Sequence, residues 1–178
     1  MTTRESPDSA RRRALRALGV FVVGAHVGAA WTGSAAAADL PEHFDPGRDA
    51  AADLARARAL ATATGRRVLI DVGGEWCTWC HIMDRFFAAH PELLALRERH
   101  YVWLKVNYST QNRNEALLQR WPKVAGYPHW FVLTADGTLV RSQDTGVLEA
   151  GRDYDPTAMR VFLTRYAAPA GVRAPGSA

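Results

Sequence analysis

Cysteine is scarce in this chain of 178 residues, which contains only Cys77 and Cys80. A small exported domain stabilised by structural disulfides usually carries more cysteines, at longer separations. A structural zinc site needs four ligands, and no second cysteine pair is present to complete one. Both thiols therefore belong to one local C-x-x-C motif.

A strong excess of positive charge is absent from most of the chain. Residues 1–38 hold five arginines against Glu5 and Asp8, whereas the remaining residues hold 17 basic and 16 acidic side chains. The nearly balanced charge of residues 39–178 argues against a surface that binds nucleic acid, so we expect no nucleic-acid partner. The length suits one compact domain with extensions, and we expect a monomer.

The sequence also lacks an apolar stretch that is well suited to span a membrane. The apolar stretch at residues 17–31 is short, rich in Ala and Gly, and interrupted by His26. It follows an arginine-rich start at residues 11–16 and precedes Ala36-Ala37-Ala38, which fits an A-x-A cleavage site. We predict that residues 1–38 form an export signal, and the arginine run at residues 11–16 resembles a signal of the twin-arginine type. The protein would then be periplasmic or in the cell envelope, soluble after cleavage. A retained membrane anchor and a disordered basic tail are the alternatives.

Hydrophobic periodicity in the rest of the chain predicts one α/β domain. We expect a polar lead-in at residues 39–48, the domain at 49–167 and a disordered tail at 168–178. The expected helices cover 49–64, a segment starting near 77, a segment after Pro91, 112–121 and 155–166. The expected strands cover 68–72, 101–108, 130–134 and 138–141, the last two joined by a turn at 135–137. This order indicates a mixed β-sheet sandwiched by helices.

The C-x-x-C motif lies where a helix should begin, directly after a strand that reads as buried on both faces. The first cysteine of such a motif meets the unpaired N–H groups and the positive dipole end of the helix, which stabilise its thiolate. The thiolate attacks a disulfide, and a second thiol one turn later resolves the mixed disulfide. The placement of Cys77 and Cys80 therefore favours thiol–disulfide exchange.

Residues 68–80 resemble the active-site strand and motif of the thioredoxin family, in which an apolar strand ending in Asp leads into Glu-Trp-Cys-x-x-Cys. The resemblance covers residues 49–166. Lys105-Val106-Asn107 is similar to the family's central strand, Gly126-Tyr127-Pro128 to its cis-proline loop, and residues 130–140 to its terminal hairpin. The Trp-Cys-x-Trp-Cys-His form is most similar to the exported branch, which includes reductase domains serving periplasmic disulfide traffic.

The resemblance implies four catalytic residues and no cofactor beyond a redox-active Cys77–Cys80 disulfide. Cys77 would be the attacking thiolate and Cys80 the resolving thiol. Asp71 would be a buried carboxylate that accepts the proton of Cys80 through water, and Lys105 would lie near Asp71 and moderate its pKa. The implied partners are exported protein thiols or disulfides and a membrane-bound electron donor. We expect a reductase, although the direction of electron flow stays open.

The resemblance also implies three substrate-binding residues. Pro128 would be the cis-proline that faces the disulfide, Tyr127 would offer backbone hydrogen bonds to the substrate chain, and Trp76 would shield the site and contact substrate. Two departures from the family pattern matter. Thr78-Trp79 replaces the common Gly-Pro between the cysteines, so the family's redox potential is not carried over to this protein. Tyr127 is bulkier than the usual residue before the cis-proline.

Other uses of the motif stay open. Residues 77–81 also fit the C-x-x-C-H pattern of c-type haem attachment. A zinc or copper site would have to recruit His81 and His129. A redox-inactive binding module would use Tyr127, Trp130 and the cis-proline loop to hold a partner protein or a metal.

Several of these residues also have plain structural interpretations. Asp71 could cap the end of its strand, Pro128 could be a trans turn proline, and Lys105 could lie on an exposed face. The tryptophans outside the motif are expected to pack in the core or at its edge: Trp103, Trp121 and Trp130.

Overall fold

The computed structural model describes residues 39–169, so the predicted export signal and most of the predicted tail lie outside the described residues. Its main feature is a four-stranded sheet formed by β1 (Arg67–Gly73), β2 (Tyr101–Asn107), β3 (His129–Leu133) and β4 (Leu139–Asp144). The strands lie in the order β2-β1-β3-β4. β1 pairs in parallel with β2 and antiparallel with β3, and β3 pairs antiparallel with β4. The predicted mixed sheet is confirmed.

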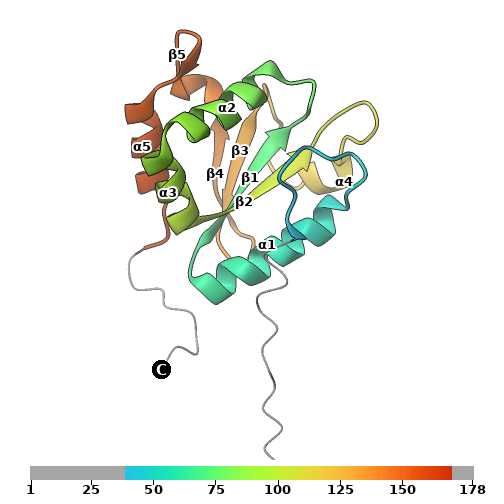
Figure 1. The fold of residues 1–178 in the computed structure, drawn as a ribbon. Coiled ribbons are helices and arrows are strands. Elements are labelled where there is room, and N and C mark those ends of the chain that lie inside the picture. The colour runs from blue at the N-terminus through green and yellow to red at the C-terminus, as the bar shows by residue number, and fades with distance from the viewer. Residues whose placement is uncertain (1–38, 170–178) are drawn as a thin grey trace, which may run out of the picture. The chain divides into compact units, whose positions relative to one another are not determined.

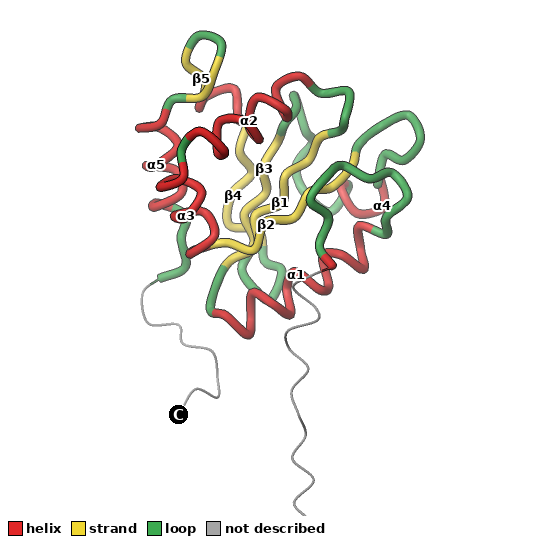
Figure 2. Tube along the Cα trace, viewed as in Figure 1, coloured by secondary structure: helices red, strands yellow, loops and turns green. Residues whose placement is uncertain are grey.

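Helices cover both faces of this sheet (Figure 1, Figure 2). α1 (Ala50–Thr64) and the short α4 (Glu115–Leu118) pack on one face. The other face carries α2 (Thr78–Ala89), α3 (Pro91–His100) and α5 (Pro156–Arg165). None of the helices within residues 39–169 is long and apolar enough to cross a membrane.

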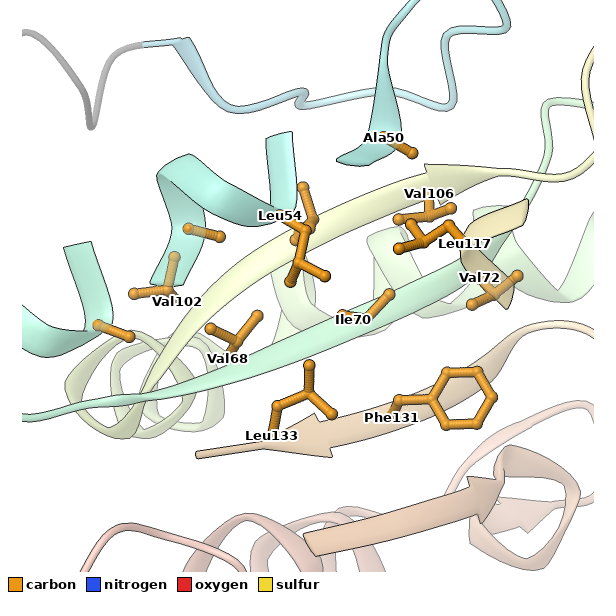
Figure 3. Packing of buried hydrophobic residues seen from close by; sticks show 13 residues of the cluster. Ala50, Leu54, Val68, Ile70, Val72, Val102, Val106, Leu117, Phe131 and Leu133 are labelled. Carbon is orange, nitrogen blue, oxygen red and sulfur yellow. The ribbon is translucent and has the colours of Figure 1, made fainter. Parts of the chain in front are cut away.

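Alternation along β1 divides the core into two layers. Val68, Ile70 and Val72 lie in one cluster with Leu54 of α1, and Figure 3 shows Val72 near Leu117 and Val106. Leu69 lies on the opposite face, in a cluster that also holds the expected apolar stripe of α2 and the fully buried Trp130. Because side chains alternate along a strand, Asp71 and Gly73 share the face of Leu69, beneath α2. Every residue of β1 after Arg67 is buried, as the continuous apolar run predicts.

Local capping explains why several element ends match the sequence-based expectation. The Asp49 side chain accepts hydrogen bonds from the first N–H groups of α1, and Gly65 ends that helix in the left-handed conformation at φ 67°. The Asp155 side chain caps α5 in the same way, with Pro156 at its first position. The hairpin turn is confirmed at Gly137, whose φ is 93°.

The helix expected over residues 112–121 is wrong, because only Glu115–Leu118 is helical. Asparagine side chains bind loop backbone ahead of it. Asn112 Nδ2 donates to the Pro46 carbonyl and Asn114 Nδ2 donates to the Asn107 carbonyl. Asn114 itself has a positive φ of 49°. Such side-chain bonds compete with helix formation, and periodicity does not reveal them.

Residues 145–154, for which the pattern suggested no element, form a short insertion before α5. It consists of the 3-10 turn η2 (Thr145–Leu148) and a two-stranded ribbon of β5 (Glu149–Ala150) and β6 (Asp153–Tyr154). Tyr154 packs edge-on against Trp79 and Phe86 of α2. The insertion therefore extends the buried layer on the face that carries the C-x-x-C helix.

Candidate active site

Cys77 and Cys80 form a disulfide at the N-terminus of α2. Cys77 is the N-cap residue of the helix, and its Sγ accepts a hydrogen bond of 3.1 Å from the Cys80 backbone N–H. Both residues are buried, with 3% and 0% of their surface exposed. In the dithiol form, the same N–H group and the helix dipole would stabilise a thiolate on Cys77.

The Asp71 carboxyl lies in the sheet between Lys105 of β2 and Trp130 of β3, which are its partners in register. It has no exposed surface. Trp130 Nε1 donates a hydrogen bond of 3.1 Å to Oδ1, whereas Oδ2 has no hydrogen-bond partner. Lys105 Nζ lies 3.9 Å from Oδ2. Asp71 is thus a buried acid with one oxygen free to take a proton.

Burial raises the pKa of Asp71 to about 7, because desolvation disfavours the charged carboxylate. The positive charge of Lys105 lowers this pKa, the negative charge of Asp84 raises it, and the hydrogen bond from Trp130 lowers it. A carboxyl that titrates near neutral pH is able to exchange a proton with a thiol.

The sulfur of Cys80 packs on the face of β1 that carries Asp71. A methyl group placed on Gly73 would overlap Cys80 Sγ, so the sulfur packs directly on the Gly73 backbone. Gly73 is the next residue after Asp71 on the same face of β1. The fold therefore places Cys80, Asp71 and Lys105, which the sequence had placed on three separate elements, on one face of the sheet.

Lys105 is buried, with 5% of its surface exposed, so the exposed-face interpretation is wrong. Its shortest contacts are to Asp84, whose carboxylate oxygens lie 2.7 and 2.9 Å from Nζ. Sequence reasoning did not single out Asp84. The available signal was its position one helical turn after Cys80, on the same side of α2.

Trp76 and Tyr127, two of the three predicted substrate-binding residues, lie beside the disulfide. Trp76 is 57% exposed, and its Nε1 donates a hydrogen bond of 2.7 Å to the Tyr108 carbonyl. The Tyr127 ring packs edge-on against Trp76 and stacks on Tyr108, and Tyr127 also packs against the buried cluster of the two cysteines. The Tyr127–Pro128 peptide bond is cis, and the Pro128 carbonyl accepts a hydrogen bond from Thr145 Oγ1.

Phe44 is a site residue that sequence reasoning missed. It lies in the lead-in that reads as polar, yet it is 2% exposed and packs against Cys77 and Cys80. Its ring centroid lies 4.3 Å from Lys105 Nζ, and its backbone N–H donates to Glu75 Oε1. The signal was a lone aromatic side chain in an otherwise polar segment.

Comparison with known proteins agrees with this geometry. A family model described as thioredoxin-like matches residues 49–135. The solved structure of a disulphide isomerase from Xylella fastidiosa Temecula1 superposes with a TM-score of 0.60 at 26% identity, covering 71% of this chain and 96% of that chain. Residues 49–135 belong to the thioredoxin-like family. The predicted fold class is therefore confirmed.

Two curated relatives of this thioredoxin-like chain are thiol:disulfide interchange proteins. DsbE of Pseudomonas aeruginosa is 33% identical over 117 residues, which is 65% of this chain and 54% of the relative. DsbD of Pseudomonas fluorescens is 36% identical over 101 residues, which is 56% of this chain and 17% of the relative. The chain thus matches about half of one relative and a small part of the other.

The two histidines weighed as metal ligands have other partners in this thioredoxin-like domain. His81 Nε2 lies 2.8 Å from the Glu75 carbonyl oxygen, and His129 Nε2 lies 2.8 Å from Ser142 Oγ. His129 is buried, and desolvation lowers its pKa. Within residues 39–169 no group of three or more His, Cys, Asp and Glu side chains is arranged to hold a metal ion.

Proposed function

We propose that this protein is a thiol–disulfide oxidoreductase that reduces disulfides in exported proteins. The observation that carries the proposal is the Cys77–Cys80 disulfide at the N-terminus of α2, whose Cys80 sulfur packs on Gly73, two residues after the buried Asp71 on the same face of β1. The two curated relatives, both thiol:disulfide interchange proteins, support the same activity. No cofactor beyond the cysteine pair is required.

The reaction proceeds in two exchanges. In the dithiol form, the Cys77 thiolate attacks a substrate disulfide, a mixed disulfide forms, and the first substrate sulfur leaves as a thiolate that takes up a proton. Cys80 then transfers its proton to Asp71 through water, and its thiolate attacks Cys77 Sγ. The Cys77–Cys80 bond forms, the bond to substrate breaks, and the second substrate sulfur leaves. Two electrons pass from the cysteine pair to the substrate.

The residues around the disulfide suit a protein substrate. Trp76 presents an exposed ring fixed by its bond to Tyr108, and Tyr127 lies against it. We propose that the substrate chain binds over Trp76 and along the backbone of Tyr127 and Pro128. The electron donor would be a membrane-bound protein, and the working location would be the periplasm or cell envelope.

The catalytic proposal is tested by replacing each cysteine in turn. Cys77→Ser should abolish reduction of insulin disulfides, whereas Cys80→Ser should accumulate a mixed disulfide that gel electrophoresis without reductant detects. Unchanged turnover in Cys77→Ser would exclude the catalytic role and leave the redox-inactive binding module. A Soret band in the purified protein would instead support haem attachment at residues 77–81.

The direction of electron flow is tested by the equilibrium reduction potential, titrated against a thiol buffer in protein starting at Asp39. A two-electron transition at or below about −220 mV supports a reductase, and one near about −120 mV would make the protein an oxidant. The absence of a reversible transition would exclude both.

A further inference from the structure

Phe44 is held against the candidate active site by several contacts that reach across the chain. Its backbone N–H donates a hydrogen bond of 2.9 Å to Glu75 Oε1, one residue before Trp76. The Asn112 side chain donates to the Pro46 carbonyl at 2.9 Å, and Arg48 pairs with the buried carboxylate of Asp53. The segment that carries Phe44 is therefore a fixed part of the domain.

The Phe44 ring occupies a position between the sulfur atoms and the buried charges. It lies against the Gly73 backbone, the same surface on which Cys80 Sγ packs. On its other side it faces the Lys105 ammonium, with 4.3 Å between the ring centroid and Nζ. An aromatic face attracts a cation at this distance and displaces water from it.

We infer that Phe44 is a positioning residue for the resolving step, because its ring shields Lys105, and through it the unpaired oxygen of Asp71, from bulk solvent. Asp71 Oδ2 has no hydrogen-bond partner and Lys105 is only 5% exposed. This inference rests on the proposed function, in which Cys80 gives its proton to Asp71.

Charged groups on every neighbouring element act on Asp71. Lys105 from β2 lies 3.9 Å away, and Asp84 of α2 and Arg97 of α3 also act on its titration. Glu42 of the lead-in borders the same hollow as Lys105 and Asp84. Trp130 of β3 adds its hydrogen bond. Desolvation is the largest influence on the Asp71 pKa, so removing the shield that Phe44 provides should shift this pKa.

Loss of the ring should admit water and lower the pKa of Asp71 towards its ordinary value. In the resolving step, ionised Asp71 takes the Cys80 proton, the Cys80–Cys77 bond forms, and the substrate sulfur leaves as a thiolate. The rate of this step should decrease at pH values below the pKa of Asp71, because a protonated carboxyl accepts no further proton. Removing Phe44 should therefore move this acid limb to lower pH.

The experiment uses the full chain in the dithiol form, with 5,5′-dithiobis(2-nitrobenzoic acid) as the disulfide. Attack by Cys77 releases one thionitrobenzoate, and resolution by Cys80 releases the second, which absorbance follows from pH 5 to 9. The wild-type resolving rate should show an acid limb with a midpoint of about 7. Phe44→Ala should lower this midpoint by about half a pH unit or more, and Phe44→Leu, which keeps apolar bulk, should lower it less.

Leu54→Ala is the matched control, because Leu54 belongs to α1 and its side chain is buried on the opposite face of the sheet. It should lose stability and keep the wild-type midpoint. If Phe44→Ala does not fold, the midpoint of Phe44→Leu decides. A midpoint that stays at the wild-type value in the folded Phe44 variants, or rises, overturns the inference. Failure of the wild-type protein to release the second thionitrobenzoate or to reduce insulin overturns the proposed function instead.

Discussion

Lys105 Nζ lies 2.7 Å from Asp84 Oδ1 and 3.9 Å from Asp71 Oδ2, so one ammonium group lies between two carboxylates. The Asp84 side chain is 44% exposed, whereas that of Asp71 is fully buried. Lys105 forms its direct ion pair with Asp84, the more exposed of the two carboxylates. The buried carboxyl is left with incomplete charge compensation, which is consistent with its raised pKa.

Asp84→Asn should lower the pKa of Asp71 below its wild-type value of about 7. The substitution removes a negative charge that raises this pKa and releases Lys105 to approach Oδ2. The pH dependence of the resolving rate measures the change. Glu92→Gln is a suitable control, because Glu92 pairs only with the exposed Arg160, at 3.7 Å. A midpoint that rises in Asp84→Asn would contradict the arrangement described here.

Trp130→Phe should shift the midpoint in the opposite direction, to higher pH. The indole donates a hydrogen bond to Asp71 Oδ1, and its loss leaves the charged carboxylate with no hydrogen-bond donor. Trp121→Phe is the matched control, since Trp121 packs against Phe131 on the other face of the sheet. Equal midpoints in the two tryptophan variants would show that the hydrogen bond does not influence Asp71.

Asp71→Asn should change how stability depends on pH. The folded protein keeps a proton on Asp71 up to a pH of about 7, whereas the unfolded chain releases it near pH 3.8. The wild-type free energy of unfolding should therefore decrease as pH rises between these values, by at most about 4 kcal/mol from this group. The variant lacks this decrease and should gain stability relative to wild type above pH 7. Urea denaturation of the wild type and the variant at pH 5 and pH 8 measures how the free energy of unfolding of each depends on pH. Equal changes in the two proteins would refute the raised pKa of Asp71.

Gly73→Ala should destabilise the oxidised protein by about 1–3 kcal/mol, the usual cost of overpacking a core. The added methyl group would overlap Cys80 Sγ and press on the Phe44 ring. Gly126→Ala provides the control, because a methyl group there meets no atom within 4 Å and the backbone has no positive φ. Thermal unfolding of the two variants compares them directly, and equal losses would mean that the Gly73 contact is relaxed in solution.

Local signals in the sequence were sufficient for most of the elements. Asp49 and Gly65 set the two ends of α1 through hydrogen bonds to nearby backbone, and the short apolar run before the motif is typical of a buried strand. The start of α2 at Cys77 follows from the same kind of local pattern. The one helix that was wrong, at residues 112–121, depends on Asn112 and Asn114 binding backbone that belongs to other segments.

The sequence by itself determined the mixed α/β fold and the placement of the two cysteines at the start of a helix, because these depend on periodicity and capping within a few residues. Only the tertiary structure decided what surrounds the cysteines. The ion pair between Lys105 and Asp84 joins β2 to α2. The Phe44 side chain joins the lead-in to both elements, because it contacts Lys105 and the two cysteines. Such contacts depend on how the sheet and helices pack in three dimensions, and burial, which no local pattern measures, then sets the acidity of Asp71.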